Sequence, residues 1–258
     1  MTVTTSMRGH VAVLELDYPD THNALSATLV GDLLKALREL DRVAARAVVI
    51  GTAGRFFSAG ANINDLRAGG WLNGERLAAD PIALFEALAS HPLPVVAAVS
   101  GPALGGGFEL TLCCDLVVVA DTAWFATPEM GLGVIPNTAM ARLPGIVGRR
   151  RAMEIMWTRR RVTPSEALAM GLVNVVVPAA DVLDTAVALA RRIVEGVPPG
   201  ALEALKRGVS SHGPTDWEQV RTSVGRLPRA EWEEGLGAFL DKRRPDYEPF
   251  WQASASPD

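Results

Sequence analysis

Strand-like and helix-like segments alternate along the first two thirds of this chain, and their order limits the folds open to it. The expected strands are short, rich in β-branched residues and bounded by turn residues, and they cover residues 11–16, 47–50, 95–99 and 116–120. Between the first two, Ser26 can cap a helix whose apolar face carries Leu29, Leu33, Leu37 and Leu40. Such alternation predicts an α/β fold with largely parallel strands.

The last third of the chain is mainly helical from Ser165 onward, with one more strand-like run at residues 172–177. We expect helices over residues 182–194, 200–209, 216–224 and 230–241, and Thr215 is a natural N-cap for the third of them. No internal repeat or low-complexity linker interrupts the chain. The sequence therefore predicts an α/β core over residues 1–195 and a helical region over residues 196–258.

Composition and charge exclude several classes of protein. Hydrophobic residues make up 48% of the chain and charged residues 21%, which is ordinary for a soluble globular protein. The net charge of −4 gives no electrostatic reason to expect a nucleic-acid partner. No apolar run is long enough for a membrane span, and the first residues do not resemble a signal peptide. We expect a cytoplasmic protein with neither nucleic acid nor membrane as a partner.

The cysteines and histidines give no sign of a metal site. Cys113 and Cys114 are adjacent, so they rarely satisfy the geometry of a disulfide with each other, and their apolar surroundings favour buried thiols in a reducing compartment. The four histidines lie far apart, without the spacing of a zinc motif.

Two stretches stand out because glycine clusters beside apolar strands, at residues 57–66 and 100–110. Glycines in such turns let a ligand approach main-chain amides closely, and two converging amides would form an oxyanion hole. From glycine alone, tight turns that serve only the fold are the commoner role. Neither stretch carries a P-loop or a dinucleotide-binding spacing, so a nucleotide cofactor is not expected.

Five segments in register resemble the crotonase (enoyl-CoA hydratase/isomerase) family over roughly residues 8–247. Residues 57–66 resemble the family signature, and residues 105–109 resemble its Gly-Gly-Gly-x-Glu turn. The other three segments are Asn23-Ala24-Leu25, the stretch from Thr127-Pro128-Glu129 to Pro136, and residues 234–243.

The resemblance implies a spiral of β-β-α units whose C-terminal helices trimerise, giving a homotrimer or a hexamer built as a dimer of trimers. It implies an acyl-CoA substrate and no separate cofactor, since coenzyme A is part of the substrate. Glu109 and Glu129 match the two catalytic glutamates, and the amides of Ala61 and Gly106 match the oxyanion hole. The substrate-binding positions expected are Ala24, Ala59, Ile63, Leu66, Trp71, Pro136, Asn137, Phe239 and Lys242.

Two carboxyl groups flanking a C=C bond can supply the base that activates water and the acid that protonates the α-carbon. Burial and mutual proximity are expected to raise the pKa of at least one of them. The pair favours an enoyl-CoA hydratase, or the reverse dehydration. A Δ3,Δ2-enoyl-CoA isomerase is the alternative, and it can work with Glu129 alone. A non-enzymatic alternative is an RNA-binding homologue, but the helix after Ser26 mixes Lys35, Arg38 and Arg42 with three acidic residues and offers no basic stripe.

The chain departs from the family pattern at two places, and a third segment resembles a variable part of the family. After Pro136, the run from Asn137 to Leu143 replaces a Gly-rich segment and is about one residue shorter; we expect Asn137 or Thr138 to cap the following helix and the acyl pocket to be altered. Tyr18 stands where many relatives place an arginine, so one phosphate contact is in doubt. Residues 67–80, which include Trp71, resemble a variable segment that covers the pocket.

Overall fold

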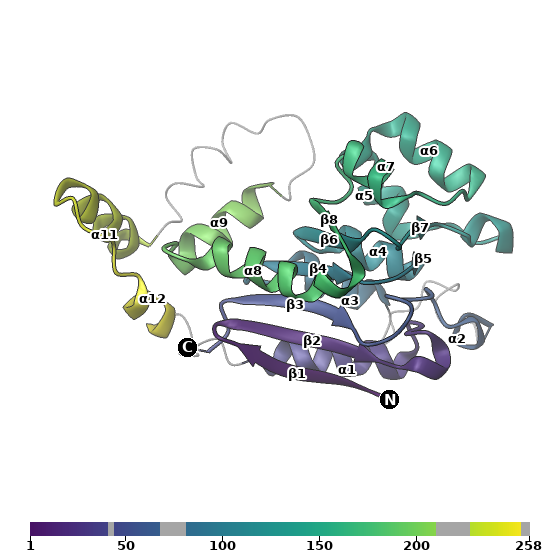
Figure 1. Ribbon diagram of the computed structural model, residues 1–258, viewed down its shortest axis with the longest axis horizontal. Coiled ribbons are helices and arrows are strands. Elements are labelled where there is room, and N and C mark those ends of the chain that lie inside the picture. Colours follow the sequence, from purple (N-terminus) through teal and green to yellow (C-terminus); the bar gives the residue numbers. More distant parts are fainter. Residues whose placement is uncertain (41–43, 68–80, 210–227, 254–258) are drawn as a thin grey trace.

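A six-stranded sheet runs through the centre of the molecule (Figure 1). The computed structural model describes residues 1–40, 44–67, 81–209 and 228–253. The sheet has the order β1-β2-β3-β4-β6-β8, with β1 antiparallel to β2 and every other pair parallel. Its strands are β1 (Thr2–Arg8), β2 (Val11–Asp17), β3 (Ala47–Thr52), β4 (Val95–Val99), β6 (Leu116–Ala120) and β8 (Val175–Val177). The predicted α/β class with a largely parallel sheet is confirmed.

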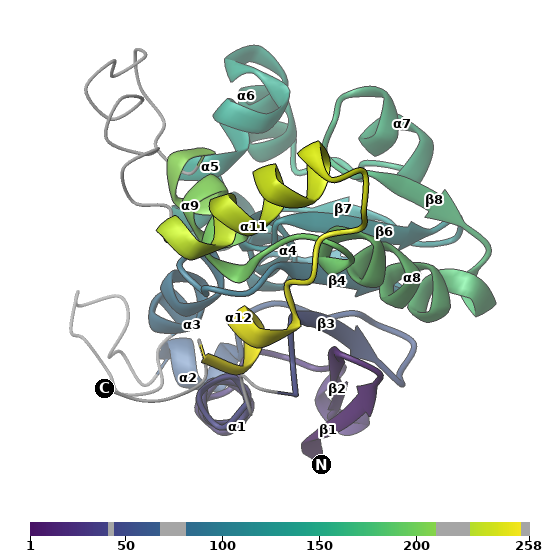
Figure 2. The ribbon, with the colours of Figure 1, turned by 90° about the vertical axis from the view of Figure 1, so that its left-hand side faces the viewer.

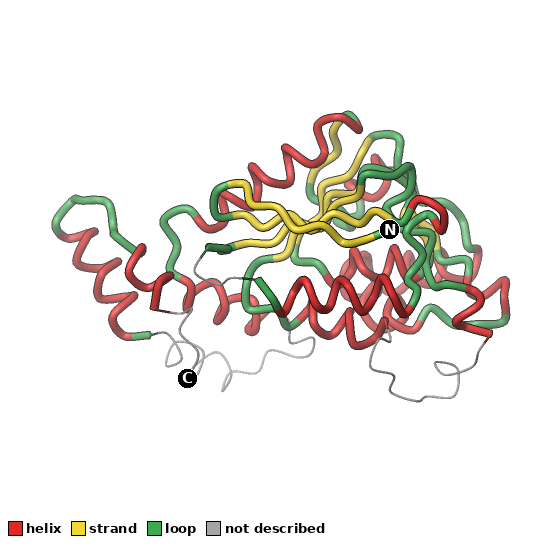
Figure 3. Tube along the Cα trace, turned by 90° about the horizontal axis from the view of Figure 1, so that it is seen from below, coloured by secondary structure: helices red, strands yellow, loops and turns green. Residues whose placement is uncertain are grey.

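Helices cover both faces of this sheet, which is why its central strands are apolar on both sides. All five residues of β4 are buried. Helix α8 (Val182–Val194) packs on β3, β4 and β6, whereas α1 (Ala27–Arg38) and α3 (Pro81–Ala89) lie on the other side (Figures 2 and 3). Helix α1 begins as predicted, because Ser26 Oγ accepts a hydrogen bond from Leu29 N at 3.2 Å.

The segments that would carry chemistry lie at the carboxyl ends of the parallel strands, toward the right in Figure 1. This edge is where α/β folds commonly bind ligands. A second, two-stranded parallel sheet pairs β5 with β7 there. The elements are α2 (Ile63–Arg67), β5 (Ala103–Leu104), α4 (Gly106–Cys113), β7 (Phe125–Ala126), the 3-10 helix η2 (Glu129–Leu132) and α5 (Asn137–Val147).

The C-terminal helices α11 and α12 lie at the opposite end of the molecule, toward the left in Figure 1. Trp251 of α12 is only 2% exposed, and its Nε1 donates to Val197 O at 3.3 Å. The guanidinium of Arg46 lies over the Trp251 ring and pairs with Glu248. These contacts hold α12 against the segment that precedes β3 and the segment that follows α8. The remaining elements are η1 (Pro19–Thr21), α6 (Arg149–Thr158), α7 (Pro164–Ala169), η3 (Ala179–Asp181), α9 (Pro199–Val209), α11 (Arg229–Leu240) and α12 (Glu248–Ala253).

Some predicted elements need adjustment. The strand expected at residues 172–177 is confined to β8, because Leu172 N instead donates to Ala167 O at 2.8 Å in the turn after α7. The edge strand β1 was not predicted. The helix expected over residues 216–224, with its cap at Thr215, lies outside the described residues. A division at residue 195 remains a prediction. None of the described helices has the length and apolar character needed to cross a membrane.

Candidate active site

The two glycine-containing turns lie directly against each other. Leu104 N donates to Ser58 O at 2.9 Å, and Ser58 and Ala103 form a parallel bridge. A Cβ placed on Gly60, where φ is +91°, would lie 2.7 Å from the Leu104 carbonyl oxygen, and one on Gly107 would lie 2.6 Å from that of Ser58. Contacts this short are accessible only to glycine, so the glycines set how closely the turns approach.

Two backbone amides converge where these turns meet. A Cβ placed on Gly106 would lie 3.5 Å from Ala61 N. Within the described parts of the chain, neither the N–H of Ala61 nor that of Gly106 donates a hydrogen bond. Gly106 is the first residue of α4, so its N–H also lies at the positive end of a helix dipole. Two neighbouring amides without partners are the kind of donor pair that can stabilise an anionic oxygen.

Glu109 lies on the first turn of α4, 7% exposed, and its carboxylate caps another helix. Its Oε1 accepts hydrogen bonds from Thr138 N and Ala139 N, both at 2.9 Å, at the start of α5. The expectation that Asn137 or Thr138 would cap α5 is therefore wrong. Pro136 occupies the N-cap without a side-chain bond, and the acceptor comes from a distant part of the sequence. One oxygen of Glu109 is thus fixed by a helix N-terminus.

Glu129 begins η2, in the turn that follows the short strand β7. A Cβ placed on Gly105 would lie 2.5 Å from Glu129 Oε1, so the backbone of Gly105 and this carboxyl are in contact. Glu129 Oε2 is buried and has no hydrogen-bond partner among the described residues. Since Gly105 precedes the free amide of Gly106, this carboxyl lies next to the converging amides.

Burial perturbs both carboxyl groups in the same direction. The pKa of Glu129 is raised to about 7, mainly by burial; a bond from its own backbone N–H opposes this rise, and the charge of Glu109 adds to it. Burial also raises the pKa of Glu109, against the lowering effect of the Ala139 and Thr138 amides. Near neutral pH, Glu129 can therefore either hold or release a proton.

Buried polar side chains beneath the first turn hold it in shape. Asn23 is 1% exposed; its Oδ1 accepts from Tyr18 N at 2.8 Å and its Nδ2 donates to Phe56 O at 3.0 Å. Ser58 Oγ donates to Asn23 O at 2.7 Å and accepts from Gly60 N at 3.2 Å. No role was predicted for these two side chains, although an asparagine and a serine inside apolar motifs were the signal available in the sequence. The hydroxyl of Ser58 therefore serves to hold the backbone of this turn in place.

Several other expected substrate positions surround this edge. Ala59 N donates to His22 O at 3.0 Å, which ties the first turn to the segment that leads into the buried Ala24. Pro136 is buried just before α5, whereas the next residue, Asn137, is exposed. Ile63, 52% exposed, begins α2, which also contains Leu66.

Two expected positions are not brought to this edge within the described protomer. Phe239 belongs to α11, and Lys242 follows the end of that helix, at the opposite end of the molecule (Figure 1). Trp71 lies outside the described residues.

Tyr18 is committed to the interior of the fold. It is 4% exposed, and its hydroxyl donates to a carboxylate oxygen of Asp32 in α1. Burial, followed by that hydrogen bond, raises its pKa. The side chain therefore presents no positive charge to a ligand.

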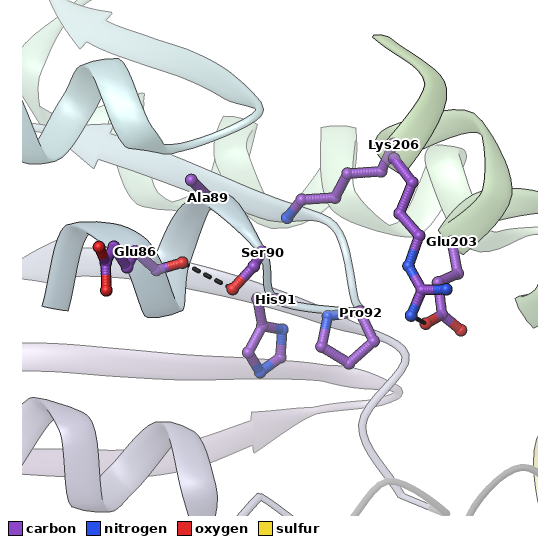
Figure 4. Close-up of a pocket in the computed structure, with 8 residues that line it drawn as sticks. Glu86, Ala89, Ser90, His91, Pro92, Glu203 and Lys206 are labelled. Carbon is purple, nitrogen blue, oxygen red and sulfur yellow. Dashed lines mark hydrogen bonds and ion pairs between the residues drawn. The ribbon is translucent and has the colours of Figure 1, made fainter. Parts of the chain in front are cut away.

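A separate hollow of about 500 Å³ lies where α3 ends and α9 passes, before β4 begins (Figure 4). Lys206 reaches from α9 toward the end of α3 and donates to Asp115 Oδ2 at 2.8 Å, and Arg207 pairs with Glu203 at 2.5 Å. The two cations of the hollow, Lys206 and Arg207, are therefore paired with carboxylates of the protein itself. The hollow lies at the amino ends of the strands, away from Glu109 and Glu129. Among the described residues, no group of three or more His, Cys, Asp or Glu side chains is placed to hold a metal ion.

Comparison with known proteins identifies the family to which the chain is similar. The family model for enoyl-CoA hydratase/isomerase matches residues 6–249. A Bacillus subtilis protein with a provisional enoyl-CoA hydratase/isomerase name is 35% identical over 248 residues, covering 92% of this chain and 94% of the relative. The short-chain-enoyl-CoA hydratase of Clostridium acetobutylicum is 30% identical and covers 92% and 93%.

Solved structures show the same fold. The enoyl-CoA hydratase of Bacillus anthracis superimposes with a TM-score of 0.84 at 29% identity, covering 96% of this chain and 99% of that one. The enoyl-CoA hydratase of Mycobacterium smegmatis gives 0.85 at 29% identity, with the same coverage. The chain belongs to the enoyl-CoA hydratase/isomerase, or crotonase, family.

Proposed function

We propose that the protein is an enoyl-CoA hydratase that adds water across the C=C bond of a 2-enoyl-CoA thioester, or removes it in the reverse direction. The observation that carries this proposal is the presence of two carboxyl groups, the buried Glu109 and the partly buried Glu129, beside two amides that donate no hydrogen bond among the described residues. Coenzyme A enters as part of the substrate, and no separate cofactor is required.

In the proposed reaction, the amides of Ala61 and Gly106 hold the thioester oxygen. The carboxylate of Glu109 takes a proton from water as the water oxygen bonds to the β-carbon. The C=C electron pair moves toward the thioester oxygen, forming an enolate that the amides stabilise more strongly than the ground-state carbonyl. The carboxylic acid of Glu129 then gives its proton to the α-carbon. The pKa of about 7 suits this donor, because an appreciable fraction is protonated at neutral pH.

The fixed oxygen of Glu109 supports its assignment as the base. Because the α5 amides bond Oε1, the second oxygen is the one left to meet a water molecule. These amides also favour the charged form, which opposes the effect of burial.

Kinetics of two isosteric variants test the proposal. Hydration of crotonyl-CoA is followed by the loss of absorbance of the conjugated thioester, for wild type, Glu109→Gln and Glu129→Gln. We expect each variant to lower kcat by roughly 10²- to 10⁴-fold, the usual contribution of a general acid or base. Unchanged rates in both variants would show that the acid/base assignment is wrong. Loss in Glu129→Gln alone, together with migration of a 3-enoyl double bond, would instead indicate an isomerase.

We also propose that the protein assembles as a homotrimer or as a dimer of trimers. The position of α11 supports this, because Phe239 and Lys242 can serve a CoA site only on another protomer if α11 stays where it lies. Light scattering coupled to size-exclusion chromatography gives the mass directly, and a monomer of 27.4 kDa would contradict the assembly.

A further inference from the structure

The backbone of Arg159, where α6 ends, has an unusual conformation. Its φ of +55° and ψ of +21° lie in the left-handed region, and its N–H donates to Ile155 O at 3.0 Å to close the helix. Glycine is the usual residue at such a position, because a Cβ there costs free energy. Among the described residues, Arg159 forms no salt bridge that would explain an arginine here. Strained residues of this kind cluster at functional sites, so the contacts of this side chain are informative.

The Arg159 guanidinium lies against the backbone of the 3-10 helix η2. A Cβ placed on Gly131 would overlap Arg159 Nη1 and would lie 3.4 Å from Arg159 Cδ and Cζ. Gly131 is the third residue of η2, which begins at Glu129, and its N–H donates to Pro128 O at 2.9 Å. The guanidinium therefore packs on the turn that carries Glu129.

The chain that follows Arg159 contacts the segment on the other side of Glu129 in the sequence. Val162 N donates to Phe125 O at 2.8 Å, and Phe125 N donates to Val162 O at 3.0 Å. Residues 159–162 thus contact the polypeptide both before and after Glu129, and Arg159 supplies the contact that comes after it.

The part of η2 beyond Glu129 is exposed to solvent. Met130, Gly131 and Leu132 are all exposed, so burial contributes little to holding this short helix in place. A shift of η2 would move the Glu129 carboxyl relative to the backbone of Gly105, against which it lies. A contact that restrains η2 from outside therefore bears on the placement of this carboxyl.

We propose that Arg159 is a positioning residue for the hydration reaction: its side chain holds η2 in place and thereby fixes the carboxyl of Glu129. This inference rests on the proposed function, since it assigns a support to the proposed acid. Arg159 acts on the reaction only through η2. The rise in the pKa of Glu129 comes from burial and from the charge of Glu109, so loss of Arg159 is expected to act through geometry and solvent access.

Replacing Arg159 with glycine tests this proposal without adding strain. Glycine adopts the left-handed conformation freely, so the urea midpoint of Arg159→Gly should be no lower than that of wild type. We expect kcat on crotonyl-CoA to fall by roughly 5- to 50-fold with KM nearly unchanged, because a displacement of about 1 Å can cost on the order of 10²-fold in rate. The falling limb of the pH–rate profile should move below pH 7, since a displaced Glu129 is better hydrated and its pKa drops.

Further variants test whether the contact with Gly131 carries the effect. In Gly131→Ala, the added Cβ would take the place of Arg159 Nη1, so we expect a similar fall in kcat. A protein that combines both substitutions should be no slower than Arg159→Gly, because the two changes remove one and the same contact. Arg159→Gln keeps much of the side-chain length and should recover part of kcat. Arg151→Gln, at an exposed arginine of α6, is the matched control and should leave kcat unchanged.

Two results would overturn the inference: a wild-type kcat and pH profile in Arg159→Gly, or falls in kcat that multiply in the doubly substituted protein, which would mean that Arg159 and Gly131 act separately. If wild type does not hydrate crotonyl-CoA, the proposed function fails by itself. The pKa of Glu129, measured by NMR of ¹³C-labelled glutamate and assigned with Glu129→Gln, then decides the role of Arg159. A lower pKa in Arg159→Gly than in wild type supports that role, and an equal pKa rejects it.

Discussion

Replacing Gly105 with alanine should strongly lower the activity, because the added Cβ would displace the carboxyl of Glu129. The chemical identity of both catalytic glutamates stays unchanged in this variant. The added Cβ would lie 2.5 Å from Glu129 Oε1, about 1 Å closer than an ordinary contact between carbon and oxygen. The carboxyl must therefore move by about 1 Å, and a displacement of that size can cost on the order of 10²-fold in rate. Backbone strain adds to this, since Gly105 has φ +49° and ψ −123°, a region that costs other residues about 1–3 kcal/mol.

Gly171→Ala provides the matched control for that strain. Gly171 also has a positive φ, of +77°, but a Cβ there meets nothing within 4 Å. We expect both variants to lose about 1–3 kcal/mol in urea unfolding followed by circular dichroism, whereas only Gly105→Ala should lose roughly 10²-fold in kcat on crotonyl-CoA. A folded Gly105→Ala protein with wild-type kcat would refute the placement of Glu129 against this glycine.

Other predictions concern the pH response and the buried polar residues. Because the pKa of Glu129 is raised to about 7, kcat for hydration should fall as pH rises through about 7, with the pH–rate profile as the measurement. The same shift affects stability, because the unfolded Glu129 carboxyl ionises near pH 4.5 while the folded one keeps its proton up to about pH 7. Stability should therefore fall by up to about 3 kcal/mol as pH rises from about 4.5 to 7. Chemical unfolding at pH 5 and 8 should show a smaller loss in Glu129→Gln than in wild type, because only the contribution of Glu109, whose pKa is also raised, remains in the variant. Ser58→Ala should cost about 1–3 kcal/mol, since it leaves the Asn23 carbonyl and Gly60 amide without their buried partner; an unchanged urea midpoint would contradict this. Tyr18→Phe should leave KM for crotonyl-CoA unchanged, because its hydroxyl is bonded to Asp32; a several-fold rise would show that the tyrosine contacts the substrate.

Locally encoded elements were predictable from the sequence. The strands at Val95–Val99 and Leu116–Ala120 and the helix at Val182–Val194 have the predicted bounds, since a β-branched run between turn residues and an amphipathic repeat are complete signals in themselves. Strand β1 was missed because nearly all its residues are exposed and several are polar. Only its pairing with β2 makes it a strand, and pairing is not visible in a single segment.

In the candidate site too, the residues could be found from the sequence, but the long-range contacts that position them could not. The resemblance to the family drew attention to Glu109 and Glu129, but the contacts that fix them join segments far apart in the chain. Glu109 caps a helix that begins 28 residues later, and the carboxyl of Glu129 is set by the backbone of Gly105. The capping prediction failed for this reason: it considered only side chains next to the start of α5, where the actual acceptor is supplied by tertiary structure.

The central claim is that water adds across a double bond under the control of two carboxyl groups. Mass spectrometry of the product made from crotonyl-CoA in D₂O enriched in H₂¹⁸O tests it most directly. The wild-type product should contain one solvent oxygen at the β-carbon and one solvent deuterium at the α-carbon, and neither Glu109→Gln nor Glu129→Gln should form it at an appreciable rate. A product without solvent oxygen, or labelling that persists at the wild-type rate in both variants, would contradict the account.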